Sequence, residues 1–73
     1  MKEPVTGIVI CASEGENGPF HSAVFNLDEI DIGEARKLVN GGELNMPDFV
    51  ERAMSVDAVM VGKNGRCETV RIR

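Results

Sequence analysis

Aromatic residues are scarce in this sequence, which has no tryptophan, no tyrosine and three phenylalanines. RNA-binding sheets stack bases on exposed aromatic rings, and we expect the three phenylalanines to lie in the core. The scarcity therefore argues against an RNA-binding sheet. His21 is the single histidine, and a catalytic histidine needs a nucleophile and an orienting group beside it. The sequence places neither there, so we expect His21 to be structural and the protein not to be an enzyme.

Metal ligands of the cysteine and histidine type are equally few. Cys11, His21 and Cys67 are the complete set, whereas a structural zinc site usually takes four such ligands. The acidic stretch 28–31 lacks the alternating oxygen ligands and the central glycine of a calcium loop. We therefore predict no metal and no cofactor. The two cysteines lie 56 positions apart, which excludes a C-x-x-C motif, and we expect both to be free thiols buried in the core.

Long hydrophobic runs are absent as well. No apolar stretch approaches the roughly 20 residues that span a bilayer, and the first residues do not resemble a secretory signal. We therefore expect a cytoplasmic protein without membrane contact. The 73 residues allow one domain, 1–73, and 42% of them are hydrophobic, as in folded proteins. A domain of this size buries only about 60% of its unfolded surface, so association with another chain would add stability.

The first half of the chain predicts two strands. Residues 5–12 are nearly all apolar and rich in β-branched side chains, which is typical of a central strand or one covered on both faces. A glycine-rich turn over 13–19 leads to a second strand over 20–27. The odd positions of this second strand, among them Phe25 and Leu27, are the more apolar set, and we expect them to face the core.

Two helices are predicted to follow. Asp28 and Asp31 are alternative N-caps of the first helix, which ends at the glycines 41 and 42. Pro47 and Asp48 mark the start of the second helix. Its expected apolar stripe comprises Met46, Phe49, Val50, Ala53 and Met54.

The last segment predicts a hairpin, because Asn64-Gly65 lies between the β-branched runs 57–62 and 67–72. A two-residue type I′ loop places Val59 opposite Val70 and Met60 opposite Thr69. One face then carries Val59, Val61, Val70 and Ile72. The other face carries Ala58, Met60, Thr69 and Arg71, with Arg73 beyond the strand. A slip of one residue in the pairing would exchange these two faces.

The element order predicts an α+β fold with two layers. A four-stranded antiparallel sheet in the order β-β-α-α-β-β, with two short helices on one face, is the simplest closure. The order of the strands within the sheet stays open. Such a fold leaves one sheet face bare, and this face is our candidate interaction face, made by Ala58, Met60, Thr69, Arg71 and Arg73.

Charge is unevenly distributed along this acidic chain, whose net charge is −4. Residues 1–57 sum to −7 and residues 58–73 to +3. A basic patch of Lys63, Arg66, Arg71 and Arg73 keeps a nucleic-acid accessory role open, although an acidic body makes nucleic acid an improbable partner. The acidic surface suggests another alternative, an inhibitor of a basic partner protein.

The leading hypothesis is a protein-interaction module. The sequence offers no catalytic constellation, and it predicts both a small core and a bare sheet face. We therefore expect contact with a protein partner or with a second copy of the chain, giving a homodimer through the sheet face or an edge strand.

Overall fold

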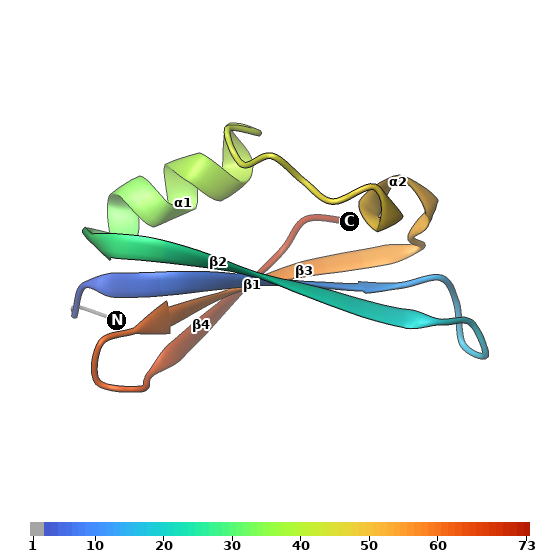
Figure 1. The fold of residues 1–73 in the computed structure, drawn as a ribbon, viewed down its shortest axis with the longest axis horizontal. Coiled ribbons are helices and arrows are strands. Elements are labelled where there is room, and N and C mark those ends of the chain that lie inside the picture. Colours follow the sequence, from blue (N-terminus) through green and yellow to red (C-terminus); the bar gives the residue numbers. More distant parts are fainter. Residues whose placement is uncertain (1–2) are drawn as a thin grey trace.

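Four antiparallel strands form one sheet, and two helices cover one of its faces in the computed structural model, which describes residues 3–73. Figure 1 shows both helices on the same side of the sheet. The predicted two-layer α+β fold with the order ββααββ is confirmed. The elements are β1 Val5–Ser13, β2 Phe20–Ile30, α1 Ile32–Asn40, α2 Phe49–Arg52, β3 Ser55–Gly62 and β4 Cys67–Arg71.

The strands lie in the order β2-β1-β3-β4, so the two hairpins meet through β1 and β3. This long-range pairing is antiparallel and brings Ile8 opposite Met60 and Ile10 opposite Ala58. All four side chains are fully buried. The two strands with the most buried apolar side chains thus occupy the centre, and β2 and β4 form the edges.

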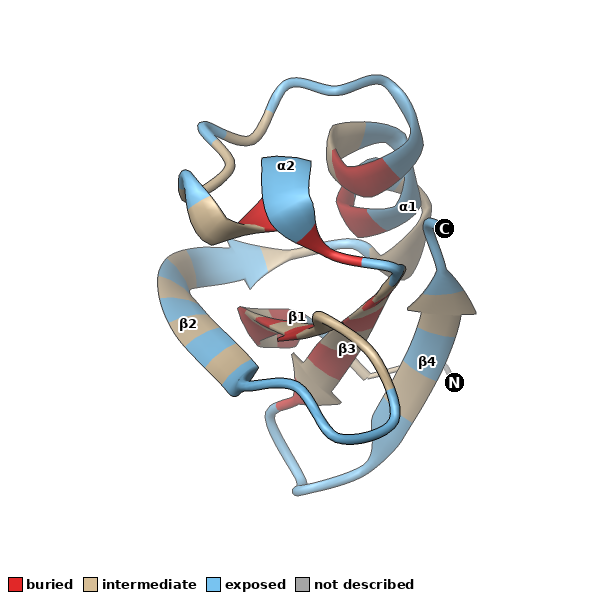
Figure 2. Cartoon of the chain, turned by 90° about the vertical axis from the view of Figure 1, so that its right-hand side faces the viewer, coloured by how far each residue is buried: buried red, intermediate tan, exposed pale blue. Residues whose placement is uncertain are grey.

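The buried hydrophobic residues belong mainly to β1, β3 and the two helices (Figure 2), and they form one hydrophobic cluster. The helices contribute Ala35 and Val39 from α1 and Val50 from α2. Phe25 and Leu27 of β2 pack against this cluster, which confirms that the odd positions of β2 face inward. Helices cover only one side of the sheet, so β1 is central but not covered on both faces.

The helices differ from prediction at their ends. Asp31 is the N-cap of α1, with its carboxylate accepting a hydrogen bond from the Gly33 amide at 3.0 Å. Asp28 instead belongs to β2, which continues to Ile30. The second helix is a single turn, because Ala53 is extended (φ −77°, ψ 141°). Met54 therefore lies outside the helix and is 72% exposed, so its predicted place in the apolar stripe is wrong.

The β3–β4 turn has three loop residues, 63–65, and not the predicted two. The Gly62 amide donates to the Arg66 carbonyl at 2.7 Å, and the Gly65 amide donates to the Gly62 carbonyl at 3.0 Å. Gly65 has φ +87°, whereas no described non-glycine residue, Asn64 included, has a positive φ. This is the pattern of a type I turn followed by a left-handed glycine.

The extra loop residue shifts β4 by one position relative to β3. Val59 therefore lies opposite Thr69, and Val70 lies opposite Ala58. The predicted faces of β3 are exchanged, and Ala58 and Met60 are completely buried. Sequence could not settle this point, because Asn-Gly suits both the two-residue and the three-residue loop.

A substitution pair distinguishes the two loops. We expect Gly65→Ala to lower the free energy of unfolding by about 1 kcal/mol, since a left-handed backbone is costly for a residue with a Cβ. Asn64→Ala should change it by less than about 0.5 kcal/mol, because Asn64 has no positive φ here. Urea unfolding followed by circular dichroism measures both. Equal losses for the two variants would indicate the two-residue type I′ turn instead.

Candidate interaction surface on the open face of the sheet

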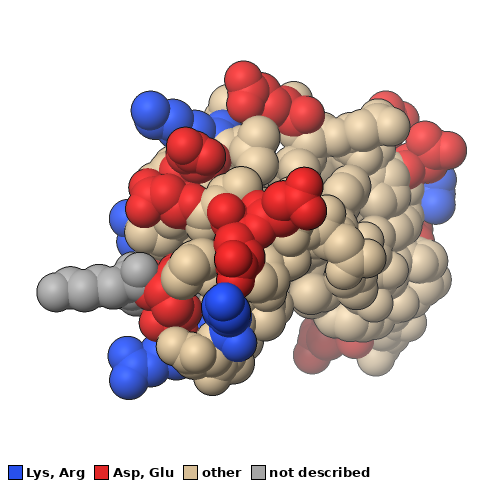
Figure 3. Space-filling model, turned by 60° about the vertical axis from the view of Figure 1, so that its left-hand side comes forward, with Lys and Arg blue, Asp and Glu red and all other residues tan. Residues whose placement is uncertain are grey.

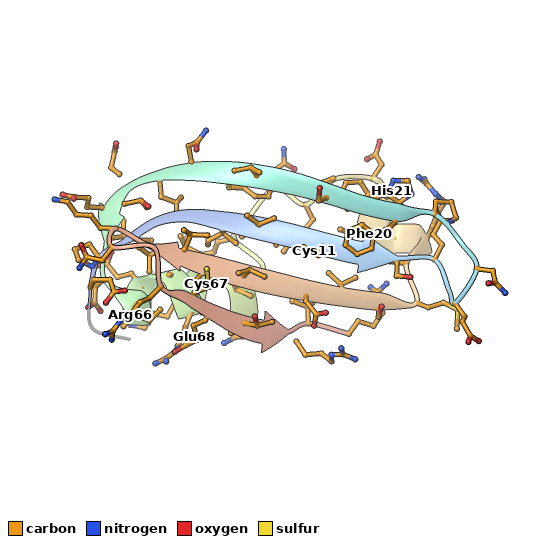
Figure 4. The ribbon with its side chains drawn as sticks, turned by 90° about the horizontal axis from the view of Figure 1, so that it is seen from below. Cys11, Phe20, His21, Arg66, Cys67 and Glu68 are labelled. Carbon is orange, nitrogen blue, oxygen red and sulfur yellow. The ribbon has the colours of Figure 1, made fainter. Side chains whose placement is uncertain are left out.

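The side of the sheet away from the helices is uncovered by any described element, and Figure 4 looks onto it. Side chains alternate between the two faces of a strand, so the inward positions of the core fix which residues lie outward. We call this outward set the open face. It comprises Phe20, Ser22, Val24 and Asn26 of β2, Val9, Cys11 and Ser13 of β1, Asp57, Val59 and Val61 of β3, and Cys67, Thr69 and Arg71 of β4.

A row of β-branched side chains crosses the middle of the open face. Val9 pairs with Val24 on one side and with Val59 on the other, and Val59 pairs with Thr69. Cross-strand neighbours of this kind have Cβ atoms about 5 Å apart, so the four side chains form one continuous apolar strip. Val24 at the β2 end of the row is 65% exposed.

Among the open-face residues named above, only Asp57 and Arg71 are charged, and exposed Asp28 follows Asn26 at the end of β2. Arg71 Nε lies 3.1 Å from Asp57 Oδ1, and the two residues are opposite each other on β4 and β3. The formal charge of this face is therefore zero, although the chain carries −4. Carboxylates predominate elsewhere, and red side chains outnumber blue ones on the surface shown in Figure 3.

The predicted interaction face is only partly located on this surface. Thr69 and Arg71 lie on the open face, but Ala58 and Met60 point into the core and are 0% exposed. Arg73 lies past the end of β4, and its guanidinium reaches the helical layer. Ala58 and Met60 were assigned to the wrong face because the predicted pairing of β3 with β4 differs from the observed pairing by one residue.

Four valine residues form the apolar centre of the open face, and the predicted interaction face did not include them: Val9, Val24, Val59 and Val61. In β1 and β3 almost every position is apolar, so alternation gives no signal to separate core from surface. The one available signal was in β2, whose more apolar odd positions imply that Val24 points outward.

The four residues of the predicted basic patch do not form one cationic surface. Lys63 Nζ lies 2.6 Å from Glu29 Oε1, and this carboxylate raises the pKa of Lys63 through a hydrogen bond and through its charge. Arg71 pairs with Asp57. Arg73 donates to the carbonyls of Val50 and Ala53 at 2.9 and 3.0 Å. Arg66 alone in this set has no ion pair or side-chain hydrogen bond within residues 3–73.

Both thiols are free and both belong to the open face. Cys11 is partly exposed and Cys67 is exposed, so the prediction that both cysteines are buried in the core is wrong. Cys11 lies beside Ser22 and Asp57, whereas Cys67 lies beside Val61 near the turn. Two strand spacings and several residues along the strands separate them, which is too far for an intramolecular disulfide.

His21 lies on the helical side of the sheet. Its ring stacks on Phe49 with centroids 5.1 Å apart, and its Nε2 lies 2.9 Å from Glu14 Oε2. Glu14 is therefore a carboxylate partner that the sequence did not place beside His21, and no hydroxyl or thiol group is hydrogen-bonded to the ring within residues 3–73. Within residues 3–73, no group of three or more histidine, cysteine or acidic side chains is arranged to hold a metal ion. A pocket of about 370 Å³ beside α1 is lined by Ile30, Glu34, Lys37, Leu38 and Glu43.

Comparisons with protein-family models, with curated proteins and with solved structures find no match to this chain. Among the helices described in residues 3–73, none has the length and apolar character needed to cross a membrane.

Proposed function

We propose that this protein is a non-enzymatic interaction module that forms a homodimer by packing the open faces of two copies against each other. The observation that carries the proposal is the valine strip at the centre of an uncharged sheet face. Stacked sheets in folded proteins pack about 10 Å apart through side chains of this kind.

Electrostatics favours a second copy as the occupant. Two copies with a net charge of −4 each repel one another through most orientations. The open face has no net charge, so contact there avoids most of this repulsion. Its one ion pair is self-complementary, because a two-fold axis can bring Asp57 of one copy towards Arg71 of the other.

The area of the open face sets the affinity expected for the homodimer. The molecule measures 35 × 22 × 17 Å, and the helices and the sheet are stacked along the intermediate axis. The face is thus 35 by 17 Å, about 600 Å² per copy and about 1,200 Å² for two, at the lower limit of stable interfaces. A weak, reversible dimer is the expected species.

The engaged cations make nucleic acid a poorer candidate partner. Binding to phosphates requires clustered and available lysine and arginine side chains. Three of the four residues in the predicted patch already contact carboxylates or backbone carbonyls, so a polyanion would have to displace these contacts.

Sedimentation velocity tests the homodimer. We expect the wild-type chain to shift from monomer to dimer between about 10 µM and about 1 mM, the range for a small interface. Val59→Lys should remain monomeric throughout, because it places a charge in the centre of the valine strip.

Asn40→Lys is the matched control, since it adds the same charge to an exposed residue at the end of α1, on the other layer. This variant should dimerise like the wild type. A wild-type chain that stays monomeric at about 1 mM, or a Val59→Lys chain that dimerises normally, would exclude the open face as the interface.

A further inference from the structure

The outer edge of β2 carries backbone groups that pair with no described strand. The Glu14 amide donates to the Pro19 carbonyl at 3.1 Å and closes the β1–β2 hairpin. Hydrogen-bonded and non-bonded pairs alternate along an antiparallel ladder. Counting from the 14–19 pair, the pair Ala12–His21 is bonded and the pair Cys11–Ser22 is not. The amide and carbonyl groups of Ser22 therefore point away from β1.

The same alternation applies along the strand, so four residues present free backbone donors and acceptors on this edge: Phe20, Ser22, Val24 and Asn26. Natural sheets usually protect such edges with lysine, proline, a bulge or a short strand. The span Phe20–Leu27 contains no lysine, arginine or proline. By contrast the other edge strand, β4, has only five residues and presents Arg71.

Negative charge lies at both ends of this free edge. Residues 3–35 contain no lysine or arginine, and their seven acidic residues are Glu3, Glu14, Glu16, Asp28, Glu29, Asp31 and Glu34. Glu14 contacts His21, and Glu29 contacts Lys63. Glu16, before β2, and Asp28, near its end, form no ion pair within the described residues.

We propose that the β2 edge binds an extended segment of a partner protein by strand addition, and that this segment is basic at both ends and uncharged in its centre. The free amides and carbonyls of β2 supply the ladder hydrogen bonds. The carboxylates of Glu16 and Asp28 attract the basic ends. This interaction uses the backbone groups of β2, whereas the homodimer uses side chains of the open face, some of them on the same strand. It does not depend on the homodimer.

Charge also argues against a second copy at this edge. Antiparallel pairing of two β2 strands would bring the acidic loop of one copy beside Asp28 and Glu29 of the other. Like charges placed this way repel, whereas lysine or arginine at the same positions would be attracted.

Selection from displayed peptides of about ten residues tests the proposal. One library has lysine or arginine in the two positions at each end, a second has aspartate or glutamate there, and both have random centres. We expect sequences from the basic library to be enriched at least about tenfold over the acidic one, with affinity falling as salt is raised.

Two variants at one position then locate the binding site. Ser22→Pro removes an outward amide without removing a hydrogen bond to β1, a change that edge strands tolerate. It should weaken binding of a selected basic peptide by more than about tenfold. Ser22→Ala keeps the amide and should bind as the wild type does. Circular dichroism and thermal unfolding establish that both variants are folded; if Ser22→Pro is not, Val24→Pro with Val24→Thr replaces the pair.

Every other outcome counts against the proposal. Equal enrichment of both libraries, or none, would overturn it. So would peptides that bind Ser22→Pro and wild type equally. A Ser22→Pro chain that loses self-association and not peptide binding would assign this edge to a second copy. Because Val59→Lys leaves the β2 edge intact, it should bind the peptide normally, and the two proposals can therefore fail separately.

Discussion

Met60→Ala is expected to lower the free energy of unfolding by about 3 kcal/mol, the usual cost of truncating a large buried side chain. Met60 is completely buried on β3, opposite Ile8 of β1. Truncation leaves a cavity between the sheet and the helices that so small a core has little means to fill. Because a domain of this size has a stability of about 5 kcal/mol, about 2 kcal/mol would remain, and the melting temperature should fall by roughly 15 °C.

Val59→Ala is the control, one residue away on the opposite face of β3. It should lower the stability by less than about 1 kcal/mol when measured at concentrations where the chain is monomeric. Urea unfolding of both variants at low micromolar concentration gives the comparison. The two-residue turn predicted from sequence would bury Val59 and expose Met60, so Val59→Ala would then lower the free energy of unfolding more than Met60→Ala. The two variants therefore distinguish the two hairpin registers.

Arg73→Ala is expected to lower the free energy of unfolding by about 1.5 kcal/mol, the lower end for hydrogen bonds made by a charged group. Its Nη1 donates to the carbonyls of Val50 and Ala53. These carbonyls belong to α2 and to the residue that ends it. The Val50 carbonyl also accepts the Ala53 amide at 3.2 Å, so Arg73 is its second donor. The side chain therefore joins the end of the chain to a helix of a single turn.

Two further variants separate hydrogen bonding from charge. Arg66→Ala removes the same charge from the exposed turn and should change the stability by less than about 0.5 kcal/mol. Arg73→Lys keeps the charge but offers a single ammonium group, so it should recover only part of the loss. Equal stability of Arg73→Ala and Arg66→Ala would show that the contacts with α2 contribute nothing measurable.

Met60 and Arg73 both occupy places in the structure that differ from those predicted from the sequence. A two-residue loop at Asn64-Gly65 would place Met60 on the surface, and the one further loop residue in the structure reverses the faces. Arg73 was expected in a basic patch because nothing in the sequence indicates where the end of the chain lies relative to α2. Contacts between residues 73 and 50 are long-range and leave no local pattern.

Strong local patterns predicted the elements correctly. The β-branched run at 5–12, the N-cap Asp31 and the glycine-rich turns act over a few residues, and each is explained by backbone sterics or a neighbouring hydrogen bond. The apolar odd positions of β2 likewise fixed its inner face. The pattern failed in β3, where apolar residues occupy both faces and alternation carries no information.

The sequence by itself determined the class of fold, the order of its elements and the acidic character of the chain. Tertiary structure decided the strand order β2-β1-β3-β4, the register of β4 and the composition of the open face. It also decided that Lys63, Arg71 and Arg73 are engaged within the chain. The physical reason is the separation along the sequence of the residues that interact. Secondary-structure propensity and helix capping depend on neighbours in the sequence. Strand order, register and ion pairing depend on distant residues that only the packing of the whole sheet brings together.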